Sequence, residues 1–319
     1  EANFRGWSPS GSDPNTGSGH YGTCCAELDI WEANAVSTQM TVHSCETTGP
    51  HRCEGIECGD NNGKNASDPG DRFKGVCDKN GCDFNPYREG AHSFYGPNST
   101  FTLDSSKPMR VVTQFVTTDG TDDGDLLEMR RFYIQNNRTF YNPTPSYGNY
   151  TAISDKMCQV QMAEFDDRYD VFSKKGGVKG MGESMRRSMA LVFSLWDDHD
   201  VGMIWLDATD PMPIPGQKPK PGALRGTCNQ TSGNYSIVEK NHPDAYVLFS
   251  DVRYGEIGST YGPGAPPPPS LCPGGTETSC IAACDPSDPA KYLQCIKACD
   301  QHCPHLDEGA VLKSVAVAP

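Results

Sequence analysis

Short runs of β-branched and aromatic residues recur along the first 260 or so positions, and each is bounded by Gly, Pro, Asn or Asp. Such runs are typical of β-strands. They predict strands at residues 109–117, 129–135, 189–196, 202–207 and 245–251. A hairpin turn is expected at Asn136-Asn137 and a short helix near residues 182–188. Long loops between short strands favour an all-β sandwich or barrel.

A further strand is predicted in the segment CCAELDIWEAN, residues 24–34, where acidic and apolar residues alternate. On a strand, Glu27 and Asp29 point to one face and the apolar residues beside them to the other. Glu32 lies an odd number of positions further along, so a regular strand would turn it to the apolar face. A β-bulge near Trp31 would return Glu32 to the side of the other two carboxylates, and we predict one there.

Three carboxylates on one face cannot all ionise easily, so their titrations are coupled and at least one keeps its proton to a higher pH. One ionised and one protonated carboxyl group, roughly 5–5.5 Å apart, is what retaining glycoside hydrolysis requires. The alternatives are a solvated strand face or a calcium site. Calcium takes many oxygen ligands, and the segment adds no Asn or Asp beyond the three carboxylates except Asn34 at its end.

Two other groupings resemble metal sites, but neither is favoured. Residues 60–71 have the composition of a calcium loop, yet Lys64 stands where an oxygen ligand belongs. A zinc cluster could be drawn from His43, Cys45, His51, Cys53 and Cys58. Disulfides explain these cysteines better, because cysteines and sequons together indicate an oxidising route. We therefore predict no metal and no cofactor.

Composition narrows the class of partner. The formal charge of −14 argues against nucleic acid and against an anionic membrane surface, since both require clustered Lys and Arg. The longest apolar run, residues 189–196, is far too short to cross a bilayer. Trp196 and Trp205, at the ends of two predicted strands, could stack on sugar rings, although core packing is at least as common for a tryptophan.

The cysteines and glycosylation sequons predict a secreted protein. The chain has 15 cysteines, and disulfides and N-linked glycans both form on the secretory route. The Asn-x-Ser/Thr sequons begin at Asn65, Asn98, Asn137, Asn149, Asn229 and Asn234.

The end of the chain differs in composition from the rest. Residues 258–271 form a Pro-rich linker. Residues 272–303 contain two cysteine pairs with helical i, i+4 spacing, which predict a small disulfide-rich helical module followed by a tail, 304–319. The module is either a glycan- or wall-binding unit or a stable appendage without a binding role.

Several motifs resemble glycoside hydrolase family 7, the cellobiohydrolases and endoglucanases of β-1,4-glucan. They run in the same order over roughly residues 5 to 260: CCAELDIWEAN, TVHSC, CDKNGCDFNPYREGAHSFYGP, VVTQFVT, SLWDDHDVGMIWLDAT, PGALRGTC and FSDVRYGEIGST. The resemblance implies a concanavalin-like β-jelly-roll sandwich whose long loops cover a glucan cleft. It also implies hydrolysis by a retaining double displacement.

By resemblance, Glu27 is the nucleophile, Glu32 the general acid/base, and Asp29 the residue that hydrogen-bonds the nucleophile. His43 would lie beside the leaving-group sugar, and Trp196 and Trp205 would be platforms on either side of the scissile bond. The residues matching the product side are Arg72, Asp83, Arg88 and Arg225.

The long segments 58–77 and 207–225 favour a cellobiohydrolase that releases cellobiose from cellulose or cello-oligosaccharides. An endo-β-1,4-glucanase and a catalytically inactive glucan-binding protein are the alternatives. We expect a secreted monomer with no nucleic-acid or membrane partner.

The resemblance also implies that residues 1–257 are a catalytic domain without its N-terminal portion, and so would not form a closed sandwich alone. It pairs Cys45 with Cys77, Cys53 with Cys58, and Cys82 with Cys158, and leaves Cys24, Cys25 and Cys228 for partners in that portion.

Overall fold

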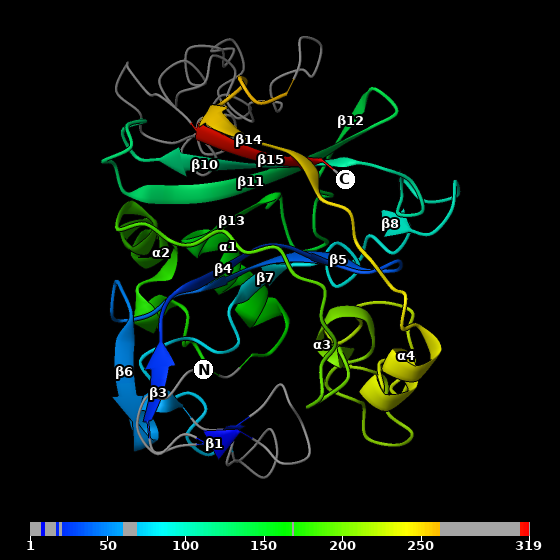
Figure 1. The fold of residues 1–319 in the computed structure, drawn as a ribbon, viewed down its shortest axis with the longest axis horizontal. Coiled ribbons are helices and arrows are strands. Elements are labelled where there is room, and N and C mark those ends of the chain that lie inside the picture. The colour runs from blue at the N-terminus through cyan, green and yellow to red at the C-terminus, as the bar shows by residue number, and fades with distance from the viewer. Residues whose placement is uncertain are drawn as a thin grey trace, which may run out of the picture.

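The computed structural model describes residues 8–9, 17–18, 21–59, 69–167, 169–261 and 313–318. Its strands form two facing layers, a larger sheet above and a smaller one below in Figure 1. The helical module at 272–303, most of the linker at 258–271 and the sequon at Asn65 lie outside the described residues.

The larger sheet is antiparallel and has the strand order β12-β11-β10-β15-β14, with β13 also paired to β11. Its centre is β10 (Arg110–Thr117) and β11 (Leu126–Gln135), which confirm two predicted strands. The remaining members are β12 (Arg138–Tyr141), β13 (Ala152–Ser154), β14 (Ser250–Glu256) and β15 (Lys313–Ala318). The predicted turn between β11 and β12 is confirmed, because Asn136 and Asn137 have φ of 53° and 58°, the left-handed values that a tight hairpin needs.

The smaller sheet has the order β4-β5-β7 and carries the acidic segment. Its strands are β4 (Glu27–Ala33), β5 (Thr38–His43) and β7 (Cys82–Phe84). Short strand pairs surround it: β1 (Ser8–Pro9) with β2 (Gly17–Ser18), β3 (Tyr21–Cys24) with β6 (His51–Glu54), and β8 (Tyr95–Gly96) with β9 (Leu103–Asp104).

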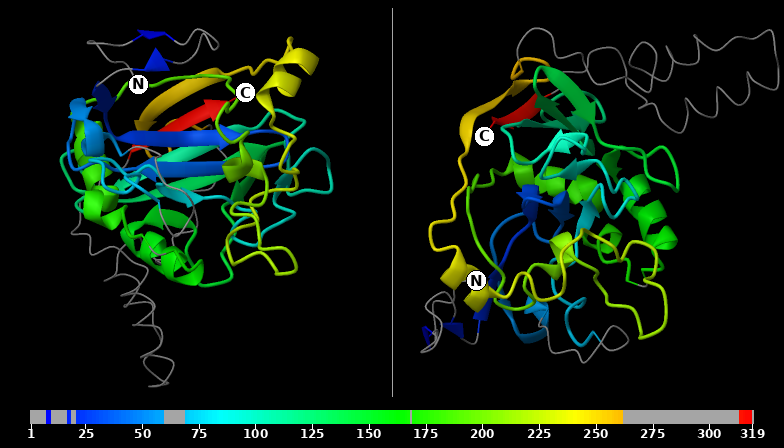
Figure 2. Two further views of the ribbon diagram at one scale, coloured as in Figure 1. Left: turned by 90° about the horizontal axis from the view of Figure 1, so that it is seen from below. Right: turned by 90° about the vertical axis from the view of Figure 1, so that its right-hand side faces the viewer.

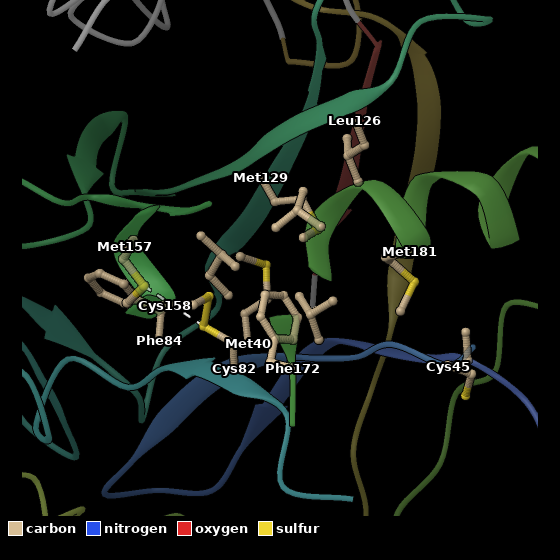
Figure 3. Packing of buried hydrophobic residues seen from close by; sticks show 14 residues of the cluster. Met40, Cys45, Cys82, Phe84, Leu126, Met129, Met157, Cys158, Phe172 and Met181 are labelled. Carbon is tan, nitrogen blue, oxygen red and sulfur yellow. Dashed lines mark hydrogen bonds between the residues drawn. A yellow bond between two sulfur atoms is a disulfide. The ribbon is translucent and has the colours of Figure 1, made fainter. Parts of the chain in front are cut away.

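The core lies between the two layers and is closed by two helices, α1 (Asp155–Glu164) and α2 (Gly177–Arg186). Figure 3 shows Met129 and Leu126 of the upper sheet pointing toward Met40 and Phe172, with the Cys82–Cys158 disulfide beside them. Each fully buried side chain of this size stabilises the fold by roughly 1.5–3 kcal/mol relative to exposure. This packing fixes the back of the smaller sheet, so its other face can carry polar groups.

Further short helices complete the described chain. They are the 3₁₀ turns at Gly55–Cys58 and Ser173–Lys175, and the α-helices α3 (Ile204–Asp207) and α4 (Tyr235–Asn241). Figure 2 shows α4 at the opposite side of the molecule from α2. The predicted helix at 182–188 is confirmed in type, although α2 begins earlier and ends at Arg186. No described helix is long and apolar enough to cross a membrane.

Three predicted strands are wrong in whole or in part. Residues 189–196 form no strand, residues 202–207 form a turn followed by α3, and of 245–251 only the last two residues belong to a strand, β14. A strand needs a neighbour for its backbone N–H and C=O groups, and no described strand pairs with residues 189–196, 202–207 or 245–249. Many apolar side chains of 189–196 and 245–249 are exposed instead, as Val192 (73%) and Leu248 (65%) illustrate, whereas Leu206 in 202–207 is buried.

The disulfides implied by the resemblance are confirmed. Cys45 is bonded to Cys77, Cys53 to Cys58, and Cys82 to Cys158. Cys24, Cys25 and Cys228 take part in no disulfide within the described part of the chain.

Candidate active site

The register between β4 and β5 brings the three carboxylates to one face of the smaller sheet. Glu27 lies opposite His43, Asp29 opposite Thr41, and Glu32 opposite Gln39. Those partners alternate along β5 and therefore share one face. The ladder shifts between Asp29 and Glu32, so the bulge predicted near Trp31 is confirmed.

Two side chains hold this bulge. The indole Nε1 of Trp31 donates to Thr38 Oγ1 at 2.8 Å. From the facing sheet, the buried Arg131 of β11 donates through Nη2 to the carbonyl of Ile30 and through Nε to Thr113 Oγ1 at 3.1 Å. Sequence reasoning missed Arg131. The signal was the pair of adjacent arginines in MRRFYIQ, because neighbouring residues of a strand point to opposite faces and one of the two must then enter the core.

Glu32 is the carboxyl group that keeps its proton. Burial, and next the charge of Asp29, raise its pKa to about 7. Hydrogen bonds from Gln39 Nε2 (2.9 Å) and Thr41 Oγ1 (3.3 Å) to Oε2 oppose the rise. The sequence motif did not identify Gln39 or Thr41, which alternate along β5 with the buried Met40 and Val42.

Asp29 is held by His43. The Nε2 of His43 lies 3.1 Å from Asp29 Oδ2, and its Nδ1 lies 2.9 Å from the carbonyl of Asp78. Although burial acts to lower it, these contacts raise the pKa of His43 to about 9, so the ring is an imidazolium at neutral pH. Gly81 lines the ring closely, since a Cβ there would lie 2.8 Å from it. Both ring nitrogens are therefore engaged with protein groups.

Three of the residues matched to the product side form one buried ion cluster. Asp83 Oδ1 pairs with Arg88 Nη1, and Asp83 Oδ2 lies 3.2 Å from Arg225 Nη1. Burial acts to raise the pKa of Asp83, but the two guanidinium groups hold it below its ordinary value. Arg88 is further fixed by the carbonyl of Gly222 at 3.0 Å and by the ring of Phe165 at 4.5 Å.

Arg72 lies before Cys77 and contacts the loop that follows Cys77, rather than joining this cluster. Its Nε donates to Asn80 Oδ1 at 2.9 Å and its Nη2 to the carbonyl of Lys79 at 3.3 Å. The same loop supplies the Asp78 carbonyl that contacts His43. The loop thus links Arg72 to the carboxylate row.

Trp196 and Trp205 come together, but not on strands as predicted. Trp196 lies in an irregular segment and Trp205 in α3. Their rings stack with centroids 5.9 Å apart and an interplanar angle of 23°, and Trp205 Nε1 donates to Asp198 Oδ2 at 2.9 Å. The contact occupies one face of each indole, while Trp196 is still 52% exposed.

The disfavoured alternative of a zinc cluster is not formed, because Cys45, Cys53 and Cys58 are bonded as disulfides, as expected. Within the described ranges, the group best able to hold a metal is Asp197, His199 and Glu239, whose ligand atoms all lie within 4.8 Å of one another. The ion pair of His199 with Glu239, at 2.9 Å, accounts for this grouping without a metal.

Known structures share this arrangement of strands. A cellobiohydrolase from Daphnia pulex is 51% identical, with a TM-score of 0.67 over 74% of this chain and 52% of that one. A cellobiohydrolase from Melanocarpus albomyces complexed with cellotetraose is 40% identical, with a TM-score of 0.63 over 76% and 53%. An endoglucanase I complexed with cellobiose is 33% identical, with a TM-score of 0.54 over 70% and 48%.

The matched part of this chain thus spans about half the length of each relative. Three observations agree on the family of this chain. They are the β-sandwich of two facing sheets, the carboxylate row on β4, and the likeness to these enzymes. The sequence model of glycosyl hydrolase family 7 matches residues 1–261, and the chain belongs to that family.

Proposed function

We propose that the protein is a retaining glycosidase that hydrolyses the β-1,4 bonds of cellulose and releases cellobiose. The observation that carries the proposal is the split between carboxyl groups on one strand face. Glu32 is half-buried and its pKa is raised to about 7, whereas Glu27 is exposed at the start of the same strand. A protonated acid and an accessible carboxylate are the two groups that the reaction needs.

In the first step, the Glu32 carboxyl gives its proton to the glycosidic oxygen while a Glu27 oxygen attacks the anomeric carbon. The C–O bond to the leaving sugar breaks, and a glycosyl ester forms on Glu27. In the second step, Glu32, now a carboxylate, takes a proton from water as the water oxygen attacks the same carbon and releases Glu27. Two inversions give net retention.

Asp29 and His43 act beside the nucleophile rather than on the sugar in this scheme. Asp29 lies between Glu27 and Glu32 on the shared face, and the His43 imidazolium holds its carboxylate in place at 3.1 Å. We assign the Asp83–Arg88–Arg225 cluster and Arg72 to the product side, with Trp196 and Trp205 as stacking platforms. A sugar would use the exposed face of Trp196, or would part the two indoles.

Release of cellobiose is favoured over random internal cleavage by the relatives at 51% and 40% identity, which are both cellobiohydrolases. Internal cleavage is the second candidate function, because a relative at 33% identity is an endoglucanase. The described disulfides support a secreted protein.

The test is a product analysis with the full chain. Wild-type protein is incubated with cellohexaose, and the products and their anomeric configuration are followed by chromatography and NMR. We expect β-cellobiose as the main product. Products of random length would show that the protein cleaves internal bonds, as an endoglucanase does. Products of α configuration would overturn the retaining mechanism.

Two variants separate the roles of the carboxyl groups. Glu27→Gln should abolish turnover of every substrate. Glu32→Gln should abolish turnover of cellohexaose yet still form the glycosyl ester from an aryl cellobioside, whose leaving group needs no proton. If Glu27→Gln turned over as the wild type does while both proteins bound cellohexaose, the protein would be a glucan-binding protein and the assignment would fail.

A further inference from the structure

A second buried acid lies behind the product-side ion cluster. Glu89 is 3% exposed, and its Oε1 accepts a hydrogen bond of 2.7 Å from Gln161 Nε2 in α1. The same Gln161 nitrogen donates to the backbone carbonyl of Asp83, also at 2.7 Å. One amide therefore connects the Glu89 carboxyl to the residue that holds Arg88 and Arg225.

The ionisable groups that face Glu89 come from three elements. They are the Tyr147 hydroxyl from the loop after β12, Asp83 from β7, and Arg88 from the loop that carries Glu89 itself. Burial raises the pKa of Glu89 to about 7; the Tyr147 and Gln161 hydrogen bonds and Arg88 oppose the rise, and Asp83 adds to it. Glu89 Oε2 and the Tyr147 hydroxyl are both buried, and neither has a hydrogen-bond partner of normal geometry in the described structure.

While Glu89 is neutral, Asp83 is the carboxylate on which the two guanidinium groups meet, and the three groups together carry one net positive charge. Arg88 and Arg225 then share the two oxygens of Asp83. An ionised Glu89 would place a second carboxylate in the same low-dielectric space, where it would repel Asp83 and attract Arg88. The guanidinium of Arg88 would be drawn from the position set by Asp83, the Gly222 carbonyl and the Phe165 ring.

We propose that Glu89 is a positioning residue whose proton keeps Arg88 and Arg225 aligned on Asp83, and that loss of this proton weakens the binding of cellobiose on the product side. The inference rests on the proposed function, because it takes that cluster as the cellobiose subsite. The only chemical change is the release of one proton from Glu89 to solvent.

The test is the pH dependence of cellobiose affinity, measured by calorimetry on the full chain. For the wild type we expect the affinity for cellobiose to fall about fivefold or more as the pH rises through about 7. A fivefold change is the lower end of the range observed for coupled sites. Glu89→Gln keeps the acceptor for Gln161 and cannot ionise, so its affinity should stay at the low-pH value throughout. The exposed Glu164→Gln, also on this side of α1, is the matched control and should follow the wild type.

A second variant distinguishes a proton-linked role from a merely structural one. The Tyr147 hydroxyl lowers the pKa of Glu89, so Tyr147→Phe should move the fall in affinity to higher pH without removing it. A wild-type affinity that does not change with pH, or a fall that persists unchanged in Glu89→Gln, would overturn the proposal.

Failure of the proposed function can be told apart from failure of this inference. The Arg88 Nε–H donates to the Gly222 carbonyl at 3.0 Å, so its NMR resonance reports on the cluster with no sugar present. We expect this resonance to shift with pH near 7 in the wild type but not in Glu89→Gln. If cellobiose did not bind at any pH, the subsite assignment would fail, and the resonance would still decide whether Glu89 positions Arg88.

Discussion

At the scale of single residues, carboxyl groups on one strand face take different roles because their surroundings differ. Glu27, Asp29 and Glu32 are three carboxylates on one strand face, but their surroundings differ. Glu32 accepts hydrogen bonds from Gln39 and Thr41, whereas Asp29 faces the His43 ring. A donor bonded to a carboxylate favours its ionised form. Gln39 and Thr41 therefore determine how far burial can raise the pKa of Glu32.

The first prediction concerns the alkaline limit of activity. Glu32 must carry a proton in the first step, so kcat should fall as the pH rises through about 7. Gln39→Met removes a bond that lowers the pKa of Glu32, and the alkaline limb of kcat should move up by up to about one pH unit. The exposed Gln159→Met is the control. This role of Gln39 would be contradicted if the alkaline limb of kcat moved to lower pH, or if it moved equally in the control.

The second prediction concerns stability and His43. Its pKa is raised from 6.5 to about 9. Its contribution to the free energy of unfolding is therefore present in full below about pH 6.5 and is lost as the pH rises through 9. The upper limit of that contribution is about 3.5 kcal/mol, from about 1.4 kcal/mol per pH unit. Urea unfolding at about pH 6 and pH 10 should show a smaller loss of unfolding free energy in His43→Gln than in the wild type. Equal losses would mean that His43 is not the group responsible.

At the scale of elements, the bulge in β4 depends on a contact from the opposite sheet. Arg131 crosses from β11 to the Ile30 carbonyl, but it makes no ion pair with a described carboxylate. Removing a buried charge of this kind relieves a desolvation cost that offsets the lost hydrogen bonds. Its replacement should therefore disturb the geometry of the site more than the stability of the fold.

We predict that Arg131→Met lowers kcat by about tenfold or more, because small displacements of reacting groups are costly, and changes the unfolding free energy by less than about 2 kcal/mol. Arg130→Met is the matched control, since Arg130 pairs with Glu128 on the other face of β11. Steady-state kinetics and urea unfolding of both variants provide the measurement. A loss of stability without a loss of kcat would show that Arg131 serves the core alone.

The elements that could be predicted from sequence are those whose partners lie nearby in the chain. β10 pairs with β11, the next strand along the chain, and β11 pairs with β12 across the turn at Asn136-Asn137. The bulge near Trp31 follows from the spacing of the carboxylates alone. Segments 189–196 and 202–207 have strand-like composition, but no described strand takes up their hydrogen bonds. Composition cannot reveal whether a pairing partner exists. For the same reason, the long-range contacts of Arg131 and Gln161 could not be read from any motif.

At the scale of the whole molecule, the two layers and α1 are held together by packing and by one long-range covalent link. Cys82 of β7 and Cys158 of α1 are 76 positions apart, whereas Cys53 and Cys58 are 5 apart. A crosslink restricts the unfolded chain more when it closes a longer loop. The long-range disulfide also lies in the core, beneath the strand that carries Asp83.

Removing the two disulfides separately should lower the free energy of unfolding by unequal amounts. The double variant Cys82→Ala with Cys158→Ala should lower the unfolding free energy by about 4–5 kcal/mol, and Cys53→Ala with Cys58→Ala by about 2 kcal/mol, from the dependence on loop length. The first variant should also weaken cellobiose binding, because β7 positions Asp83, while the second should not. Urea unfolding and calorimetry measure the two effects. Equal losses of stability would mean that strain or residual structure outweighs loop entropy in this fold, and unchanged cellobiose binding would mean that packing alone positions Asp83.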